Sequence, residues 1–251
     1  MISLKGKNAL VTGGSRGIGA AVCKMLAQAG ASVGICYRSD KAAAEEVKAA
    51  VEAFGVTGVV LQGDLARDGV CADIFKQAIA VLGSIDIVVG NAGIWQRGPI
   101  HTMSPEDWRQ TMSANLDSLY HTCHEAALHM KPAGAGKIIL IASTAGQRGE
   151  ANYSHYAASK GAAIAMTRSL ASELGPDGIN VNCVAPGWVL TDMTAGVFSD
   201  PKYLEQQAEA IPLKRIAMPE DVAGPVVFLA SDLARHVQGA VINVNGGSVL
   251  C

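Results

Sequence analysis

The sequence has little charge of either sign and no excess of one over the other. Its 20 basic and 22 acidic side chains leave a net charge of −2 over 251 residues. Proteins that bind nucleic acid or anionic membranes usually carry a basic surface, so this balance predicts neither partner. The chain also has no apolar run near the roughly 20 residues that span a bilayer. Its first residues lack the long apolar segment of a signal peptide, and we expect a cytoplasmic protein.

Paired cysteines are missing as well. The six cysteines stand far apart in the sequence, and no two of them form a Cys-x-x-Cys motif. This scatter is typical of reduced thiols in a cytosolic protein. The six are Cys23, Cys36, Cys71, Cys123, Cys183 and Cys251. Cys251 is the last residue, and nothing near it in the sequence predicts a lowered thiol pKa.

Apolar residues make up 49% of the chain and charged residues 17%. This composition is typical of a sheet that helices bury on both faces. Short β-branched runs alternate with longer helical patterns, so we predict one α/β domain over residues 1–251. It has the Rossmann fold, with a doubly wound, seven-stranded parallel sheet and helices on both faces. The predicted strands are Asn8–Thr12, Ser32–Tyr37, Thr57–Gln62, Ile85–Val89, Lys137–Ile141, Asn180–Ala185 and Ala240–Val244. The predicted helices are Ile18–Ala29, Lys41–Phe54, Gly69–Leu82, Pro105–Met130, Tyr156–Leu174 and Pro219–Ser231.

The stretch 186–218 shows neither pattern clearly. A stretch of this length without a clear period is usually a functional loop or lid. We therefore predict a substrate loop there, which can carry short helices of its own.

Glycines crowd the junction between the first predicted strand and the first helix. The segment reads Thr12-Gly13-Gly14-Ser15-Arg16-Gly17-Ile18-Gly19. Glycines let the backbone turn tightly and approach a pyrophosphate, and the helix that follows offers free N–H groups. The spacing Gly-x-x-x-Gly-x-Gly differs from the commoner dinucleotide fingerprint. An alternative is the Gly-x-Ser-x-Gly nucleophile elbow of hydrolases, but no His-Gly-Gly motif precedes it and only His236 is offered as a late base.

The second predicted strand ends at Tyr37 and Arg38. An NAD site usually places an acidic side chain here to accept hydrogen bonds from the ribose 2′-hydroxyl. Tyr37 stands in that place, and the guanidinium of Arg38 suits a 2′-phosphate. Arg16 in the glycine loop is a second cation for the same group. We predict NADP(H) as the preferred cofactor and keep NAD(H) as an alternative.

A tyrosine and a lysine share one face of the predicted helix that begins at Tyr156. Tyr156 and Lys160 are four residues apart, which brings the phenol and the ammonium together. A nearby cation favours phenolate, so we expect Lys160 to lower the Tyr156 pKa and make it a general acid and base. Ser143 follows the strand Lys137–Ile141 and is placed to hold a substrate oxygen. Asn91-Ala92-Gly93 and Asn115 follow another strand, where such sheets bind ligands.

These motifs together give a resemblance that covers Lys5 to Gly247. The chain resembles the single-domain branch of the short-chain dehydrogenase/reductase family, and within it the 3-oxoacyl-acyl-carrier-protein reductases of fatty acid biosynthesis. The resemblance rests on Thr12–Gly19, Asp64-Leu65, Asn91–Gly93, Asn115, Ser143, Tyr156, Lys160, Pro186-Gly187, Thr191 and Asn245-Gly246-Gly247. One departure is Gly90, where many members carry a second asparagine.

The resemblance implies a role for each matching residue. Tyr156 would donate the proton, Ser143 would polarise the carbonyl, Lys160 would hold the nicotinamide ribose, and Asn115 would hold a water. Other residues would bind the dinucleotide: Gly13, Ser15, Arg16, Gly17, Ile18, Gly19, Tyr37, Arg38, Asp64, Leu65, Asn91, Ala92, Gly93, Tyr156, Lys160, Pro186, Gly187, Val189 and Thr191. The family also implies a homo-oligomer, usually a tetramer.

The substrate stays open at this point. We expect Trp95, Gln147, Tyr153, His155, Trp188 and the loop Thr191–Ile211 to line its pocket. A 3-oxoacyl thioester is one prediction, although the chain lacks the basic patch that an acidic carrier protein would need. A small free ketone, a sugar or a cyclic alcohol is the alternative, and a non-catalytic NADP-sensing protein is a remote one. No metal is predicted, because His124 and His129 are five residues apart and lie on different sides of a helix.

Overall fold

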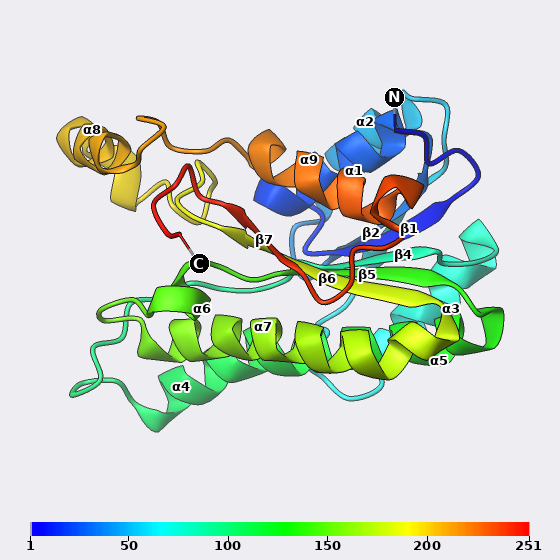
Figure 1. Cartoon of the computed structure of the whole chain (residues 1–251), viewed down its shortest axis with the longest axis horizontal. Helices are drawn as coiled ribbons and strands as arrows, with labels where there is room; N and C mark the ends of the chain where they lie inside the picture. Colours follow the sequence, from blue (N-terminus) through cyan, green and yellow to red (C-terminus); the bar gives the residue numbers. More distant parts are fainter. Residues whose placement is uncertain (1, 251) are drawn as a thin grey trace.

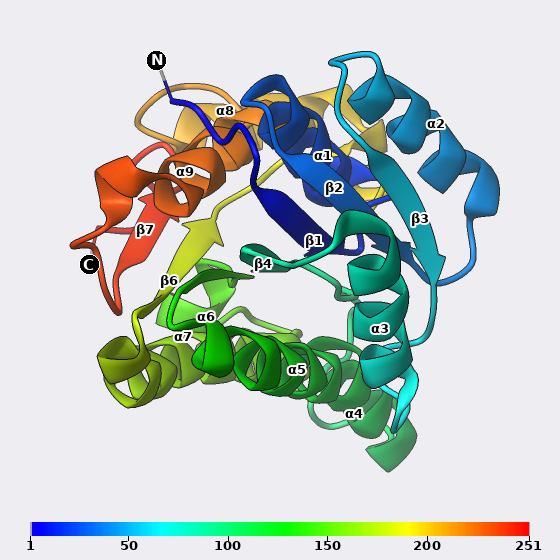
Figure 2. The ribbon, with the colours of Figure 1, turned by 90° about the vertical axis from the view of Figure 1, so that its right-hand side faces the viewer.

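Seven parallel strands form one sheet in the computed structural model, which describes residues 2–250. Cys251 lies outside the described residues. The strand order is β3-β2-β1-β4-β5-β6-β7, which Figure 2 shows from β3 at one side to β7 at the other. The strands are β1 Asn8–Thr12, β2 Ser32–Tyr37, β3 Gly58–Gln62, β4 Ile87–Gly90, β5 Gly136–Ile141, β6 Ile179–Pro186 and β7 Val241–Val244. The predicted doubly wound, seven-stranded parallel sheet is confirmed.

The central strand β1 shows why a strand of this sheet needs apolar residues on both faces. Ala9, Leu10 and Val11 are completely buried. Ala9 and Val11 pack in the core on one side of the sheet, whereas Leu10 packs in the core on the other. Successive side chains of a strand point to opposite faces, so a strand with helices on both sides needs an unbroken apolar run.

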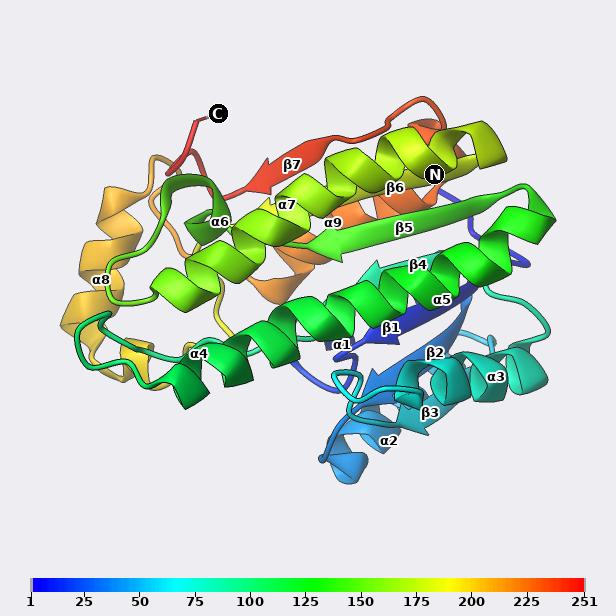
Figure 3. The same ribbon diagram turned by 90° about the horizontal axis from the view of Figure 1, so that it is seen from below.

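Helices cover both faces of the sheet (Figures 1 and 3). One layer holds α1 (Gly17–Gln28), α2 (Lys41–Glu52) and α9 (Pro219–Ala230). The other layer holds α3 (Val70–Leu82), α5 (Ser118–Ala133) and α7 (Ser154–Leu174). None of the helices within residues 2–250 has both the length and the apolar character of a membrane span.

The order of the strands reverses at β1, which pairs with β2 on one side and with β4 on the other. The connections on the two sides therefore run in opposite directions. At the carboxyl ends of β1 and β4, the loops that follow these strands turn away from each other. Open α/β sheets bind their ligands in the crevice that this parting leaves.

The prediction of one continuous helix over Pro105–Met130 is wrong. The structure has α4 (Pro105–Met112), a π-helical turn η1 (Ser113–Asp117) and then α5, which continues to Ala133. A π-turn holds an extra residue, and such turns are often found at functional sites.

Two further helices were not assigned from the sequence: the short α6 (Ala145–Arg148) and α8 (Pro201–Ala210). Helix α8 lies in the predicted substrate loop, beyond the carboxyl ends of the strands (Figure 1). The other predicted strands and helices agree with the structure to within two residues at each end.

Candidate active site

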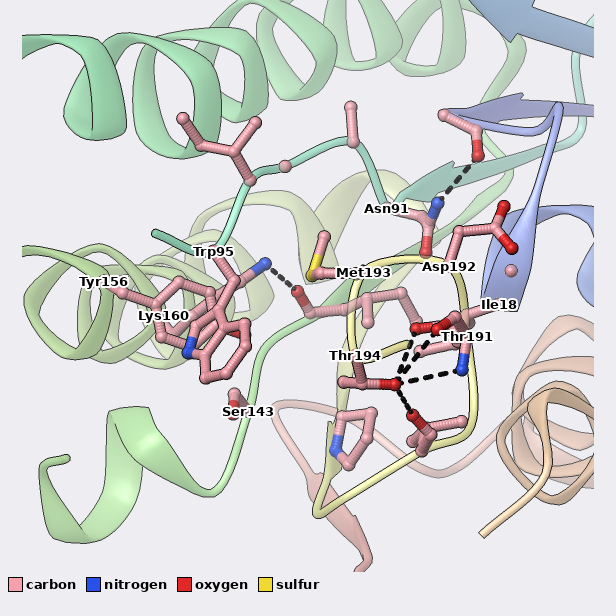
Figure 4. A pocket seen from close by; sticks show the side chains of 18 of the residues that line it. Ile18, Asn91, Trp95, Ser143, Tyr156, Lys160, Thr191, Asp192, Met193 and Thr194 are labelled. Carbon is pink, nitrogen blue, oxygen red and sulfur yellow. Dashed lines mark hydrogen bonds between the residues drawn. The ribbon is translucent and has the colours of Figure 1, made fainter. Parts of the chain in front are cut away.

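A pocket of about 830 Å³ opens at the carboxyl ends of the strands. In Figure 4, Ser143, Tyr156, Lys160 and Trp95 gather at one end of it, and Asn91, Ile18 and the segment Thr191–Thr194 lie at the other. Every residue predicted to bind the dinucleotide lines this pocket except Gly19. Of the four predicted catalytic residues, Ser143, Tyr156 and Lys160 line it, whereas Asn115 is buried behind the wall.

The glycine loop forms the floor of the pocket at the start of α1. Gly13 and Gly17 have φ angles of +63° and +53°, which few other residues adopt. At Gly19, a Cβ atom would come within 2.1 Å of the main-chain oxygen of Gly13, so only glycine fits there. Among the described residues no side chain caps α1 at Arg16, so its first N–H groups remain available for an anion. These features fit a dinucleotide pyrophosphate.

Asn91 fastens the end of β4 to this loop. Its Nδ2 donates hydrogen bonds to the main-chain oxygens of Thr12 (2.9 Å) and Gly13 (3.1 Å). The Thr12 hydroxyl in turn accepts hydrogen bonds from the N–H groups of Asn91 (2.9 Å) and Ala92 (3.0 Å). The side chain predicted to contact the adenosine ribose therefore also sets the shape of the loop.

The end of β2 carries no acid at the position that an NAD site would use. Tyr37 is buried and packs in the core, and Arg38 is exposed beside the pocket. The acids that line the same end are engaged with the backbone. Asp40 accepts from Ala43 N–H at 3.0 Å as the cap of α2, and Asp64 accepts from Ala66 N–H at 3.3 Å.

Tyr156 and Lys160 come from α7, and Ser143 comes from the loop after β5. Lys160 Nζ lies 5.9 Å from the centre of the Tyr156 ring and donates a hydrogen bond to the main-chain oxygen of Ile141 at 2.8 Å. The Ser143 hydroxyl accepts from Ala145 N–H at 3.1 Å, so the first turn of α6 orients it. The predicted trio therefore meets on one wall.

Burial changes the pKa values of this trio. It raises the pKa of Tyr156 to about 12, although the neighbouring Ser143 hydroxyl opposes part of the rise, and the charge of Glu150 adds to it. Burial also lowers the pKa of Lys160 to about 8. The structure does not show the expected lowering of the Tyr156 pKa by Lys160, because burial dominates this pKa and the ammonium donates its hydrogen bond to Ile141.

Asn115 lies in the π-helical turn and is 2% exposed. Its Oδ1 accepts from Ile94 N–H at 2.7 Å, and its Nδ2 donates to the Ile94 oxygen (3.0 Å) and to the Ser159 hydroxyl (3.1 Å). Both hydrogens of the amide are used, so the side chain has none left to donate to a water. In this geometry Asn115 ties the segment after β4 to α7, one residue away from Lys160.

The predicted substrate wall is partly wrong. Trp95, Trp188 and several residues of Thr191–Ile211 line the pocket, but Gln147, Tyr153 and His155 do not. Gln147 donates to Asn243 Oδ1 at 2.7 Å, and Tyr153 stacks on Trp95. His155 faces inward with 1% exposure. His155 is the neighbour of Tyr156 on α7, and adjacent residues of a helix point in different directions, so nearness in sequence was a poor guide there.

Glu150 is a polar residue of the wall that the sequence did not predict, whereas Gln207 lies within the predicted range Thr191–Ile211. Glu150 and Gln207 both line the pocket. Glu150 accepts a hydrogen bond from Trp95 Nε1 at 3.4 Å, and burial raises the pKa of its carboxyl. Gln207 accepts from Trp188 Nε1 at 3.1 Å. The only sequence signal for Glu150 was its place between Ser143 and Tyr156, and Gln207 was predicted only as one residue of the range Thr191–Ile211.

The histidines of α5 have other partners. His129 Nε2 accepts a hydrogen bond from Ile85 N–H at 3.1 Å, and His121 lies 3.5 Å from Asp68. Residues 2–250 contain no group of three or more side chains placed to hold a metal ion. Ser15, the nucleophile of the hydrolase alternative, lies in the glycine loop, and the exposed His236 is not part of the pocket.

A glycine loop at the switch point and a tyrosine, lysine and serine at the other end of one pocket define a class of protein. This class is the nicotinamide-dinucleotide oxidoreductases that act on a carbonyl or CH–OH group. A family model described as Enoyl-(Acyl carrier protein) reductase matches residues 13–248. The chain belongs to the short-chain dehydrogenase/reductase family.

Individual relatives agree over nearly the whole chain. The 3-oxoacyl-[acyl-carrier-protein] reductase FabG of Chlamydia pneumoniae is 39% identical over 249 residues, 98% of each protein. A crystal structure from Beutenbergia cavernae, assigned as an NAD(P) dependent gluconate 5-dehydrogenase with bound NADP at low occupancy, is 38% identical with a TM-score of 0.93, covering 98% of each chain. Another from Sinorhizobium meliloti 1021, assigned as a short-chain alcohol dehydrogenase, is 35% identical with a TM-score of 0.94, again over 98% of each chain.

Proposed function

We propose that this enzyme reduces a carbonyl group to an alcohol with NADPH, and that a 3-oxoacyl thioester is its first candidate substrate. One observation carries the proposal. Ser143, Tyr156 and Lys160 line the same pocket as the glycine loop and Arg38. A dinucleotide bound along that pocket would have its pyrophosphate at α1 and its nicotinamide beside the trio.

The chemistry divides between the cofactor and the chain. The reduced nicotinamide supplies a hydride to the carbonyl carbon when it is bound. The π electrons of the carbonyl move to its oxygen, which takes the proton of the Tyr156 hydroxyl. Because the Tyr156 pKa is about 12, the phenol keeps this proton at neutral pH and can act as the acid. The Ser143 hydroxyl orients the carbonyl, Lys160 and Thr191 hold the nicotinamide end, and Asn115 positions α7.

The preference for NADPH rests on the end of β2. The exposed guanidinium of Arg38 lies at the pocket, where it can pair with a 2′-phosphate. The buried Tyr37 stands in place of the acid that would bind a 2′-hydroxyl and repel a 2′-phosphate. The Beutenbergia cavernae structure with bound NADP supports the same cofactor. NAD(H) remains the alternative.

The test is NADPH consumption with a panel of purified substrates. We expect turnover of an acetoacetyl thioester, and faster turnover with NADPH than with NADH. A 2-enoyl thioester serves as the control for reduction of a carbon–carbon double bond, and we expect no turnover of it. If acetoacetyl thioesters and all ketones are inert, the proposed reduction is wrong.

A second candidate substrate is a free ketone or sugar that carries hydroxyl groups. The observation in its favour is that Glu150 and Gln207 place a carboxylate and an amide in the pocket wall. A hydrocarbon chain has no hydrogen bonds to offer these groups. The panel therefore includes simple ketones and hydroxyketones beside the thioesters.

We also propose that the enzyme is a homotetramer in the cytoplasm, with one catalytic domain over residues 1–251 and 186–218 as its substrate loop. Large apolar side chains are exposed on α4 and α5 at Trp108, Tyr120 and Leu128, which supports a helical interface between subunits. The five described cysteines are free and buried, which suits a reducing compartment. Light scattering distinguishes a tetramer from a dimer.

A further inference from the structure

Two tryptophans in the pocket wall each hold a polar side chain by its oxygen. Trp95 follows β4, and its indole N–H donates to Glu150 Oε2 at 3.4 Å. Trp188 follows β6, and its indole N–H donates to Gln207 Oε1 at 3.1 Å. All four residues line the pocket that holds Ser143 and Tyr156.

The two indoles belong to a continuous series of aromatic contacts. Tyr153 stacks on Trp95 with ring centres 4.6 Å apart and planes 4° apart, and Trp95 meets Trp188 edge to face at 5.7 Å and 88°. Trp188 in turn meets Phe198 at 5.2 Å, and Phe198 lies 6.4 Å from Tyr203 of α8. The series connects the start of α7 to the substrate loop. It gives the two tryptophans little freedom to move, so Glu150 and Gln207 are held in place before a substrate arrives.

The two held side chains offer opposite hydrogen-bonding groups. A carboxylate has about four acceptor positions, and the Trp95 N–H uses one of them. A glutamine amide whose oxygen is used by Trp188 still has two N–H donors. One part of the wall therefore accepts hydrogen bonds and another part donates them. A hydroxyl group both donates and accepts hydrogen bonds, so hydroxyl groups can pair with both parts of the wall.

We propose that Glu150 and Gln207 form a specificity-determining subsite that binds hydroxyl groups on the carbon chain next to the reacting carbonyl. The substrate class is then a neutral hydroxyketone or keto sugar, packed against the indoles of Trp95 and Trp188. This inference rests on the proposed carbonyl reduction, because turnover of a ketone is how it is measured. It favours the hydroxylated ketone or sugar over the 3-oxoacyl thioester as the substrate.

Two other occupants fit this wall less well. A hydrocarbon acyl chain would dehydrate the Glu150 carboxylate and the Gln207 amide and leave them without partners, which weakens binding. A cationic substrate would suit the aromatic rings and the carboxylate, but Arg148 lines the same pocket and its charge lowers the Glu150 pKa, which shows that the two lie close enough to interact. A neutral hydroxyl avoids repulsion by Arg148.

The experiment uses pairs of ketones that differ only by a hydroxyl or a methyl at one position. Suitable pairs are hydroxyacetone with 2-butanone, 4-hydroxy-2-butanone with 2-pentanone, and 5-hydroxy-2-pentanone with 2-hexanone. We expect wild-type kcat/KM to favour the hydroxyl partner by about tenfold in at least one pair, as one hydrogen bond to a charged group would give. Glu150→Ala is expected to bring that ratio close to one, and Gln207→Leu to reduce it.

Matched controls come from α8. Glu205 and Gln206 are exposed on the same helix as Gln207, so Glu205→Ala and Gln206→Leu should leave the ratio unchanged. The ratio within a pair cancels any effect of Glu150→Ala on the acidity of Tyr156. Equal kcat/KM for both partners in every pair, or a wild-type preference that survives Glu150→Ala, would overturn the proposal. A higher kcat/KM for S-acetoacetyl-N-acetylcysteamine than for every hydroxyketone would also overturn it.

A binding measurement separates this inference from the proposed reduction. The chain has three tryptophans, and Trp108 lies on α4 outside the pocket. In a Trp108→Phe, Tyr156→Phe background, fluorescence reports on Trp95 and Trp188 while a hydroxyketone is titrated with oxidised dinucleotide present. The oxidised cofactor cannot reduce the ketone, and the missing Tyr156 hydroxyl suppresses oxidation of the hydroxyl group. Saturable quenching that Glu150→Ala abolishes supports the subsite even if NADPH is never consumed, in which case only the reductase proposal fails. No quenching together with normal ketone reduction would refute the subsite alone.

Discussion

Lys160 Nζ donates a hydrogen bond to the main-chain oxygen of Ile141 at 2.8 Å, which joins the second turn of α7 to the last residue of β5. Only 7% of Lys160 is exposed, so a charged side chain is held inside the protein by one neutral acceptor. A buried ammonium with so little compensation weakens the fold, and burial accordingly lowers the Lys160 pKa to about 8. Burying Lys160 therefore costs the folded protein stability.

The first prediction concerns the stability that the protein loses by burying the Lys160 ammonium. Lys160→Met should remove activity and raise the free energy of unfolding at pH 7 by about 1–2 kcal/mol, since the gain from not burying an ammonium exceeds the lost bond to Ile141. As the pH rises from 8 toward 10.4, the unfolded wild-type chain still binds a proton that the folded chain has released, so wild-type stability increases and the difference shrinks. Urea unfolding at pH 7 and pH 10 measures it. Lys41→Met on the exposed start of α2 is the control, and a destabilised Lys160→Met at pH 7 would contradict the argument.

The second prediction concerns the proton donor. Tyr156→Phe removes the hydroxyl and should lower kcat for carbonyl reduction by about 10²- to 10⁴-fold, with little change in the dissociation constant for NADPH. Steady-state kinetics and a fluorescence titration of NADPH measure the two quantities. Tyr153→Phe is the matched control, because Tyr153 lies behind Trp95 and does not line the pocket. Equal turnover by Tyr156→Phe and wild type would rule out Tyr156 as the acid.

The third prediction follows from the acidity of Tyr156. Because its pKa is about 12, the protonated acid persists into the alkaline range, so loss of the Tyr156 proton should not lower kcat/KM for ketone reduction between pH 7 and about pH 10. A fall near pH 8 would instead report loss of the Lys160 charge. Alcohol oxidation needs the phenolate and should become faster with each step up in pH over the same range. Glu150→Gln removes a charge that raises this pKa, so its oxidation rate at pH 8 should exceed that of wild type. A decline in reduction centred near pH 7 would show that another group limits the rate.

The fourth prediction concerns the choice of cofactor. Arg38→Ala should raise the KM for NADPH by about 10- to 100-fold, as the loss of a charge-assisted contact with a phosphate predicts. The KM for NADH should change less than about twofold, because that cofactor has no 2′-phosphate. NADH is thus the internal control, and parallel initial-rate measurements decide the matter. A similar rise for both cofactors would mean that Arg38 shapes the loop rather than binds the phosphate.

Local patterns were enough to predict the sheet. Most strands are rich in apolar residues, because helices cover both faces, and β1 and β2 were predicted to the residue. The break between α4 and α5 could not be predicted, because it depends on contacts of Asn115 with Ile94 and Ser159 that are distant in sequence. No periodicity reports such contacts.

The site was predicted where the chain repeats a known motif and was incomplete elsewhere. The glycine loop and the trio Ser143, Tyr156 and Lys160 were placed correctly at one pocket, since the loops after β1 and β5 and the first turns of α7 meet at the same edge of the sheet. Glu150 was missed, and Gln207 was predicted only as one member of the range Thr191–Ile211, because a loop and a short helix place them and the direction of a side chain there depends on its neighbours.

The strand order of the sheet has a consequence for the nascent chain. Apart from β1 and β4, every pair of neighbouring strands is also consecutive in the sequence, so most of the sheet can assemble as the ribosome delivers it. One edge of β1, with Ala9, Leu10 and Val11, must stay unpaired until Ile87–Gly90 has been synthesised. An apolar strand edge that waits in this way is a site for wrong pairing between chains. The interval between the synthesis of β1 and β4 is therefore when this edge is open to such pairing.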